Sequence, residues 1–350
     1  MHITYNNNTI LIRNNYLYIN NYGDSMITKG AITDENSDIL SLIDYNGQKL
    51  SKMDIVDCFR KLNIKNGDIL FIHSDMSVYG KLLCFDTDKY LQSFFDAIRE
   101  VVGKEGTIIL PTFNWDFCCG KDFDIDHTKS KVGSLTEYFR KQKDVVRTKH
   151  PFYSVAIWGN KKEYFADISH DSFDKGSIFG KLVDSNAKIV FLGTTIMRCT
   201  FIHHIEQMYG IPYRYIKNFS GKMKIGDKEF IDTYSMLVQY IDAPTDMDLS
   251  ELENNLIKKG LMHQQTLGYG NILAVNAKDL FDEGMNMLEN NIYSFATNKP
   301  EITTQIKYGQ CIWDLIKKLY PICRSITGEG VRETLKIIQN TIPLKIQEIP

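Results

Sequence analysis

Two groups of residues carry side chains that could do chemistry: His150, a candidate base, and the pair of His203 and Glu206, in which the carboxylate could orient a histidine elsewhere in the fold. His150 precedes Pro151, which holds its backbone extended. His203 and Glu206 are three residues apart in a stretch with helical spacing, so they share one face of the predicted helix. An imidazole with a carboxylate behind it is the usual base for deprotonating an amine or a hydroxyl. His150, His203 and Glu206 are therefore the candidate catalytic residues.

Each of these residues also has a plainer interpretation. His150 could be a hydrogen-bonded structural histidine, and His203 with Glu206 could form a surface pair. Metal ligation by His203 and Glu206 is a further alternative. Their spacing is not that of H-E-x-x-H, and no third ligand is evident nearby in the sequence. We therefore predict no metal site.

Small polar residues follow three predicted strands. The strands are the apolar runs Ile69–His73, Thr107–Leu110 and Lys188–Leu192. They lead into stretches that hold His73 to Gly80, Pro111 to Trp115, Gly193 to Thr195 and, soon after, Thr200. Ligands of open α/β sheets gather at the carboxyl ends of strands, where backbone N–H groups can face a phosphate or an acyl oxygen. Ordinary turn chemistry is the alternative interpretation.

Amphipathic helices alternate with these strands. Helical spacing follows a capping box at Ser51–Asp54, covers 88–102 and follows a second capping box at Ser134–Glu137. A further strand is predicted at Val155–Trp158, with helices at Asp248–Lys259 and Ala277–Glu289 on either side of a turn at 268–270. This alternation predicts an α/β layered domain.

The two ends of the chain differ from its middle in sequence pattern. Within residues 1–46, the short runs Thr9–Arg13 and Tyr16–Ile19 predict a hairpin-like, β-rich extension. Asn298–Pro300 marks a second boundary. We therefore divide the chain into an extension (1–46), a main domain (47–298) and a tail (299–350).

Composition excludes several classes of protein. The chain has 350 residues with 41 Lys and Arg against 43 Asp and Glu, a net charge of −2 that argues against nucleic-acid binding. No apolar stretch predicts a transmembrane helix or a secretory signal. Seven scattered cysteines without a C-x-x-C pair predict reduced thiols in a cytoplasmic protein. Signatures of dinucleotide-binding, P-loop and serine-hydrolase proteins are missing from the sequence.

An ordered set of motifs is more specific than any single residue. The motifs lie in Gly67–Ser74, Val102–Thr107, Leu110–Phe113, Thr128–Arg140, Arg147–Ala156, Ser177–Leu182, Thr200–Glu206 and Pro212–Arg214. In this order and spacing they resemble the aminoglycoside 3-N-acetyltransferase family, which is unrelated in fold to the GNAT acetyltransferases. The resemblance runs from Leu50 to Ala296.

The resemblance implies a three-layer α/β/α fold with a mostly parallel central sheet. It also implies direct transfer of an acetyl group from acetyl-CoA to an amine, without a metal. His150 would be the general base and Glu206 its orienting partner, with His203 close by. The residues implied to bind the cofactor are Ser74, Asp75, Met76, Ser77, Tyr79, Gly80, Thr112, Ser177, Phe179, Gly180 and Lys181.

Asp75 and Ser77 resemble family members that accompany surface-polysaccharide genes. We therefore expect the acceptor to be an amino sugar, which could be nucleotide-linked, and the acyl group could be other than acetyl. A homodimer is a further expectation, and neither nucleic acid nor a membrane is an expected partner. One alternative is an aminoglycoside resistance enzyme, with the acidic run Asp122, Asp124 and Asp126 attracting a polycation. Others are a metal-dependent amidohydrolase using His203, His204 and Glu206, and a non-catalytic scaffold.

The tail resembles a different kind of protein. Tyr308–Leu315 and Leu319–Leu335 look like the opening of an aminopeptidase-like domain found with polysaccharide-biosynthesis proteins. We expect only the start of that domain here, in a piece of a longer protein or a fusion cut short. The segment has no set of His, Asp and Glu ligands, so we assign it no activity. It supports a role in glycan synthesis.

Overall fold

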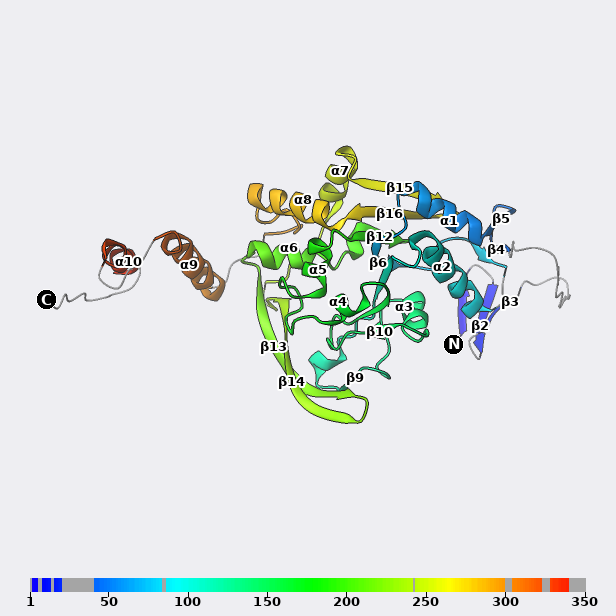
Figure 1. The fold of residues 1–350 in the computed structure, drawn as a ribbon, viewed down its shortest axis with the longest axis horizontal. Coiled ribbons are helices and arrows are strands. Elements are labelled where there is room, and N and C mark those ends of the chain that lie inside the picture. Colours follow the sequence, from blue (N-terminus) through cyan, green and yellow to red (C-terminus); the bar gives the residue numbers. More distant parts are fainter. Residues whose placement is uncertain are drawn as a thin grey trace. The chain divides into compact units, whose positions relative to one another are not determined.

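The computed structural model describes residues 2–5, 8–13, 16–20, 41–83, 86–241, 243–299, 304–322 and 328–339 (Figure 1). The chain divides into two compact units, residues 1–38 and 39–350. Described residues of the first unit form an antiparallel sheet of β1 (His2–Tyr5), β2 (Asn8–Arg13) and β3 (Tyr16–Asn20). The predicted hairpin is β2 and β3.

The second unit begins before the predicted boundary at residue 46. Strand β4 (Ser41–Tyr45) pairs with β5 (Gln48–Ser51) and with β7 (Lys81–Leu82), which both lie beyond that boundary. Helix α1 (Lys52–Lys61) follows directly, and the carboxylate of Asp54 accepts a 2.7 Å hydrogen bond from the backbone N–H of Ser51. The capping box predicted at this point is therefore confirmed.

A seven-stranded sheet forms the centre of the second unit. Its order is β10 (Val146–Arg147), β11 (Val155–Gly159), β8 (Thr107–Pro111), β6 (Ile69–Ser74), β12 (Lys188–Leu192), β16 (Gly270–Asn276) and β15 (Met262–Leu267). Only β6–β8 and β6–β12 are parallel pairs, and the other neighbours are antiparallel. The α/β class is confirmed, but the sheet is mixed rather than mostly parallel, because antiparallel strands extend the parallel centre on both sides.

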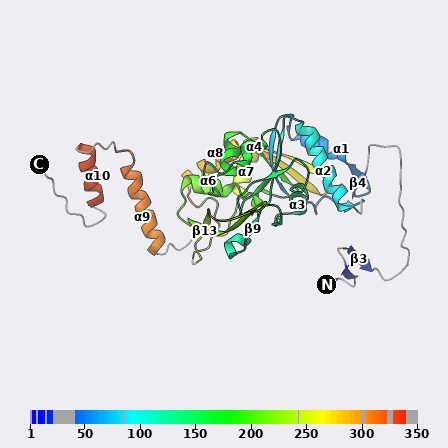
Figure 2. The same ribbon diagram turned by 60° about the horizontal axis from the view of Figure 1, so that its bottom comes forward.

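Alternating side chains of β6 enter two separate cores. Leu70 and Ile72 join one core, and Ile69 and Phe71 join the other, as the period of two in a strand requires. Helices of the two groups lie on opposite faces of the sheet (Figures 1 and 2). The three layers are therefore confirmed. One face carries α1, α2 (Thr87–Val102) and α3 (Ser134–Phe139), and the other carries α4 (Lys162–Ala166), α5 (Ile178–Asp184), α6 (Ile202–Tyr209), α7 (Ser250–Lys258) and α8 (Ala277–Asn290).

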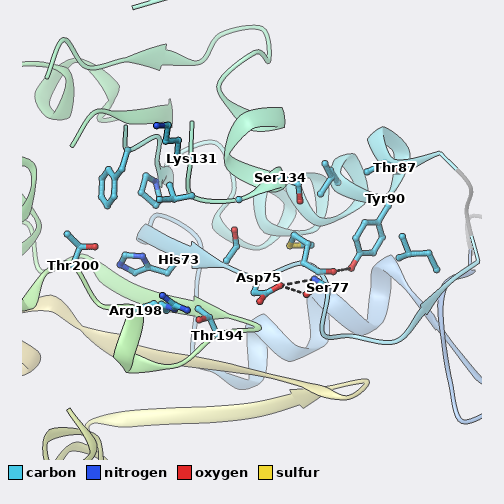
Figure 3. Close-up of a pocket in the computed structure, with 18 of the residues that line it drawn as sticks. His73, Asp75, Ser77, Thr87, Tyr90, Lys131, Ser134, Thr194, Arg198 and Thr200 are labelled. Carbon is cyan, nitrogen blue, oxygen red and sulfur yellow. Dashed lines mark hydrogen bonds between the residues drawn. The ribbon is translucent and has the colours of Figure 1, made fainter. Parts of the chain in front are cut away.

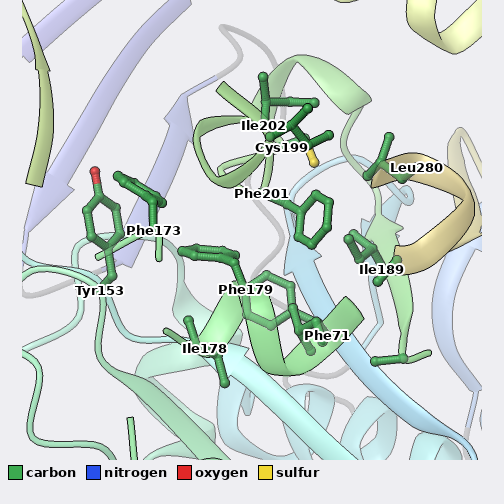
Figure 4. Close-up of a cluster of buried hydrophobic side chains, with 14 of the residues drawn as sticks. Phe71, Tyr153, Phe173, Ile178, Phe179, Ile189, Cys199, Phe201, Ile202 and Leu280 are labelled. Carbon is green, nitrogen blue, oxygen red and sulfur yellow. The ribbon is translucent and has the colours of Figure 1, made fainter. Parts of the chain in front are cut away.

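Aromatic rings dominate the core on the second face (Figure 4). Phe179 of α5 is fully buried, with ring centroids 5.4 Å from Phe173 and 5.8 Å from Phe71. Burying a side chain of this size contributes about 2 to 3 kcal/mol. The packing fixes α5 against the central strands.

Several elements do not follow from the sequence patterns. One of them is the long hairpin of β13 (Arg214–Ile225) and β14 (Lys228–Gln239), with β9 (Phe123–Asp124) beside it, in which most residues are exposed or only partly buried. The predicted turn at 268–270 joins β15 to β16. The capping box predicted at Ser134 is wrong, since Gly133 is the N-cap of α3 and Glu137 binds the backbone N–H of Ser130.

The remaining described elements are short or belong to the tail. Two 3-10 helices span Asp116–Cys119 and Ile196–Arg198. The tail forms α9 (Thr304–Leu319) and α10 (Glu329–Gln339), and the predicted tail motif between them, residues 323–327, lies outside the described residues. Within the described part of the chain, no helix has the length and apolarity needed to span a membrane.

Candidate functional site

A cleft of about 770 Å³ opens where the parallel strands β6, β8 and β12 end (Figure 3). Its lining includes His73, Ser74, Asp75, Met76, Ser77, Pro111, Phe113, Trp115, Thr194 and Thr200. Every one of these residues belongs to a stretch that the sequence placed after a strand. The expectation that polar chemistry gathers at the carboxyl ends of these strands is therefore confirmed for the second unit.

Other residues that line the cleft were missed by sequence reasoning. They are Thr87 and Tyr90 of α2, the segment Lys131–Ser134 and Arg198. Gly133 has a φ of +122°, a backbone conformation that favours glycine, and a Cβ there would make an ordinary contact with the carbonyl oxygen of Ser74, 3.4 Å away. A sequence motif alone does not reveal that this segment lies close to β6.

The loop after β6 is held by its own hydrogen bonds. One oxygen of Asp75, Oδ1, accepts hydrogen bonds from Ser77 Oγ at 2.6 Å and from Ser77 N at 3.0 Å. These bonds lower the pKa of Asp75, so its carboxylate is charged in the cleft. The hydroxyl of Tyr90 donates to the carbonyl of Met76 at 3.1 Å and ties the loop to α2.

Two residues predicted in the same loop do not line the cleft. Tyr79 is 1% exposed and packs against Phe94. Gly80 has a φ of +142°, and a Cβ there would come within 2.6 Å of the carbonyl oxygen of Asp44. Both residues anchor the end of the loop and shape the cleft only indirectly.

The other predicted cofactor-binding residues lie away from the cleft lining. Thr112 is buried, with its Oγ1 3.0 Å from Ser154 Oγ. Ser177 is the N-cap of α5, where its hydroxyl accepts from Gly180 N, and Phe179 fills the aromatic core. Lys181 donates to the carbonyl of Tyr164 at 2.7 Å. In this structure these contacts position strands and helices, and none of these residues lines the cleft.

His150 is buried behind aromatic rings, away from the cleft lining. Its Nδ1 accepts hydrogen bonds from the backbone N–H groups of Phe152 and Tyr153, at 3.3 and 3.2 Å. The ring proton is therefore on Nε2, which lies 3.4 Å from the hydroxyl oxygen of Ser172. That hydroxyl donates in turn to Ser235 O, so it can accept from Nε2. With its one lone pair occupied, His150 is not arranged to accept a proton from a substrate.

Glu206 stands behind His203 rather than behind His150. His203 Nδ1 lies 2.6 Å from Glu206 Oε2, and the hydroxyl of Tyr213 donates to Oε1 at 3.0 Å. Burial alone would raise the pKa of Glu206, but His203 and the guanidinium of Arg214, 3.1 Å away, lower it on balance. The carboxylate is therefore charged and holds the imidazole with Nδ1 toward it, leaving Nε2 as the nitrogen able to accept a proton.

Like His150, His203 does not line the cleft, but it follows a cleft residue closely in the chain. Its backbone N–H donates to the carbonyl of Thr200, a cleft residue, at 3.1 Å. The neighbouring His204 points elsewhere, since its Nδ1 donates to the carbonyl of Phe173 at 2.7 Å. Among the residues that the structure describes, no group of three or more His, Cys, Asp or Glu side chains could hold a metal ion. The amidohydrolase alternative therefore has no ligand set in this part of the chain.

The buried state of His150 predicts acid sensitivity of the fold. Burial lowers the pKa of His150 from 6.5 to about 3, so the unfolded chain binds one more proton between these pH values. Stability is then highest above pH 6.5 and falls as the pH drops toward 3, by about 1 kcal/mol per pH unit for this group. His150→Asn, whose Oδ1 can accept the same N–H bonds, should remove that part of the slope in urea unfolding measured from pH 6.5 to 4. His263→Asn, at an exposed position, is the control, and equal slopes in His150→Asn and wild type would contradict the assignment.

The protein has a mixed sheet between two helical layers and a polar cleft at the strand ends. This arrangement defines the class of α/β enzymes that bind their ligands at the carboxyl ends of the strands. Residues 71–289, more than half of the chain, match the family model described as aminoglycoside 3-N-acetyltransferase. The chain belongs to this family of acetyltransferases, as its motifs predicted.

Individual relatives agree with the family match. An aminoglycoside N(3')-acetyltransferase-like protein of Bacillus subtilis (strain 168), YokD, is 25% identical over 211 residues, which are 53% of this chain and 75% of YokD. The solved structure described as AAC-IIIb binary with CoASH is 22% identical, with a TM-score of 0.59, over 72% of this chain and 99% of that one. This structural likeness supports the shared fold.

The tail matches proteins of another kind. Residues 313–350 match a domain of unknown function (DUF4910). A putative polysaccharide biosynthesis protein with aminopeptidase-like domain, from Clostridium acetobutylicum, is 60% identical over 41 residues, which are 12% of this chain and 9% of that protein. A relative of this type is what the tail motifs predicted.

Proposed function

We propose that the protein transfers an acetyl or another acyl group from an acyl-CoA to the amine of an amino sugar. The observation that carries this proposal is the 770 Å³ cleft at the strand ends, whose lining residue Thr200 is hydrogen-bonded through its carbonyl to the backbone N–H of His203. A cleft of this volume can take the pantetheine arm and the acyl group, and a relative of the same fold is described as bound to CoASH.

The chemistry requires a base on the acceptor side of the thioester. A substrate amine is mostly ammonium at pH 7 and cannot attack until it loses a proton. Nε2 of His203 takes that proton, and the charged Glu206 stabilises the imidazolium that forms. The amine nitrogen then bonds to the carbonyl carbon, the carbonyl oxygen becomes an oxyanion, and collapse expels the CoA thiolate, which is protonated. We prefer His203 to His150, the base that the family resemblance implies, because Nδ1 of His150 already accepts two backbone hydrogen bonds.

An acceptor in surface-glycan synthesis is the substrate that the relatives and the tail support together. Fused or adjacent domains commonly serve steps of one pathway, and the relative of the tail is described as a polysaccharide biosynthesis protein. The family of the main domain is described as aminoglycoside 3-N-acetyltransferase, a name that gives an amine of an amino-sugar compound as the acceptor. An amino sugar, free or nucleotide-linked, satisfies both observations.

The choice of acceptor can be measured directly. We expect thiol release from acetyl-CoA with amino hexoses or their nucleotide-linked forms, at a kcat/KM at least about tenfold above that with any aminoglycoside; a factor of ten corresponds to ~1.4 kcal/mol of transition-state binding. The assay uses the full chain, a thiol reagent and both acceptor panels. A preference for aminoglycosides would contradict the amino-sugar proposal and leave the acyl transfer itself in place.

Aminoglycosides are the second candidate acceptor because the relatives bear that name. Two members of the acidic run that could attract such a polycation are paired with lysines in this structure. Asp122 lies 3.5 Å from Lys222, and Asp124 lies 3.3 Å from Lys224. These lysines reduce the negative field of the run.

A further inference from the structure

His73 is a buried imidazole in the wall of the cleft. It precedes the last residue of β6 and is 6% exposed. Its ring stacks on Phe191 with centroids 5.6 Å apart and meets the edge of Phe71 at 5.1 Å. Register explains the stacking, since Phe191 lies directly opposite His73 on the parallel neighbour β12. The ring is held in one orientation, and Figure 3 shows it pointing across the cleft toward Thr200.

The ring lacks the hydrogen bonds that a buried imidazole normally makes. No hydrogen bond joins it to any described residue, and Nε2 is closed off from solvent without a partner. A buried polar group left in this state costs about 1 to 3 kcal/mol. An unsatisfied buried polar group in a native protein calls for an explanation, and a ligand in the cleft would supply one here. Since Nε2 is closed off, Nδ1 is the nitrogen that a ligand in the cleft can reach.

The protonation state of the ring restricts its use. Burial lowers the pKa of His73 to about 4, so the imidazole is neutral at pH 7. It is therefore a weak base. An unpaired buried acceptor is tolerated better than an unpaired N–H, which favours the proton on Nδ1, toward the cleft. A neutral imidazole held in this way donates a hydrogen bond without having to lose a charge.

The location of His73 identifies the atom that it serves. The imidazole points toward Thr200, and the carbonyl of Thr200 accepts from the backbone N–H of His203, the proposed base. We propose that the N–H of His73 donates a hydrogen bond to the carbonyl oxygen of the acyl thioester and holds the oxyanion that forms when the amine attacks. This role rests on the proposed acyl transfer and on acyl-CoA occupying this cleft.

The electron flow requires such a donor. The amine lone pair forms the C–N bond while the C=O π pair moves onto oxygen, where the N–H of His73 stabilises it. The pair returns when the C–S bond breaks, the thiolate leaves, and the amine proton passes through the base to the sulfur. A donor to the oxyanion is worth about 10²- to 10³-fold in kcat. Because the N–H contacts the oxygen that acquires charge, His73 would be a catalytic residue.

His73→Phe tests this role, because phenylalanine fits between the same two rings. We expect kcat to fall about 100-fold. The dissociation constant of free CoA, which has no acyl carbonyl, should stay within about threefold, while binding of a non-reactive ketone analogue of acetyl-CoA weakens. The melting temperature should rise, since the unpartnered imidazole is removed. His263→Phe, at an exposed position of β15, is the matched control.

Other outcomes would overturn the proposal in identifiable ways. Unchanged kcat in His73→Phe would show that the ring does not serve the reaction. If His73→Phe weakened the binding of CoA and of the ketone analogue equally, His73 would contact the pantetheine arm instead of the acyl carbonyl. A lower melting temperature with unchanged analogue binding would make the ring purely structural. If the wild-type protein bound no CoA at all, the proposed function itself would fail, and this role with it.

Discussion

His203→Ala is expected to lower kcat about 1,000-fold while the KM for acetyl-CoA changes by less than about threefold. Nε2 of His203 takes the amine proton in the proposed mechanism, and Glu206 holds the ring from the other side. The side chain is 19% exposed, so the space left by alanine is within reach of a small solute. Added imidazole should therefore restore part of the activity. Steady-state thiol release with and without imidazole measures both effects.

The same experiment distinguishes between the two candidate bases. His150→Asn keeps an oxygen where Nδ1 accepts its two backbone hydrogen bonds, and it should retain kcat within about tenfold, a cost of ~1.4 kcal/mol at most. His127→Ala, an exposed loop position, serves as the control for loss of a histidine. Near-complete loss in His150→Asn with normal turnover in His203→Ala would reverse the assignment and restore the base implied by the family resemblance.

Phe179→Ala is expected to lower the free energy of unfolding by about 3 to 5 kcal/mol. The side chain is fully buried among Phe71, Phe113 and Phe173, so truncation leaves a cavity that neighbouring rings cannot fill without shifting. Equilibrium urea unfolding measures the loss. The effect should be structural, since Phe179 does not line the cleft.

Two further variants separate packing from cofactor binding. Phe179→Leu, which fills much of the same volume, should recover most of the stability and keep the wild-type KM for acetyl-CoA. Phe230→Ala removes a ring that is 40% exposed on β14 and should change stability little. A raised KM in Phe179→Leu at unchanged stability would instead support the cofactor contact that the family motif implied.

Most elements of the central fold could be predicted from the sequence. The predicted strands at 69–73, 107–110, 155–158 and 188–192 match β6, β8, β11 and β12 to within one residue at each end. These strands are short, continuously apolar and bounded by turn residues, so local composition is sufficient to find them. The β13–β14 hairpin has mixed polar and apolar residues that are mostly exposed or partly buried, and its two strands are held by pairing with each other.

The site was predictable in part for a similar reason. The positions at strand ends could be read from the sequence because parallel strands bring their carboxyl ends to one edge, and the structure places His73, Thr194 and Thr200 there. No sequence pattern near Tyr90, the segment 131–134 or Arg198 predicts that these residues line the cleft. These residues meet the strand ends only because α2 and the loops fold over that edge.

The sequence by itself determined the family, the α/β layered fold class and the strand ends where a ligand could bind. The spacing of apolar residues, the turn residues and the order of motifs can all be read directly along the chain. The proposed choice of His203 as the base rests on the tertiary structure alone. A histidine's role depends on which nitrogen is already hydrogen-bonded, and in His150 two backbone N–H groups occupy Nδ1. In His203 a buried carboxylate holds Nδ1, which leaves Nε2 for the substrate.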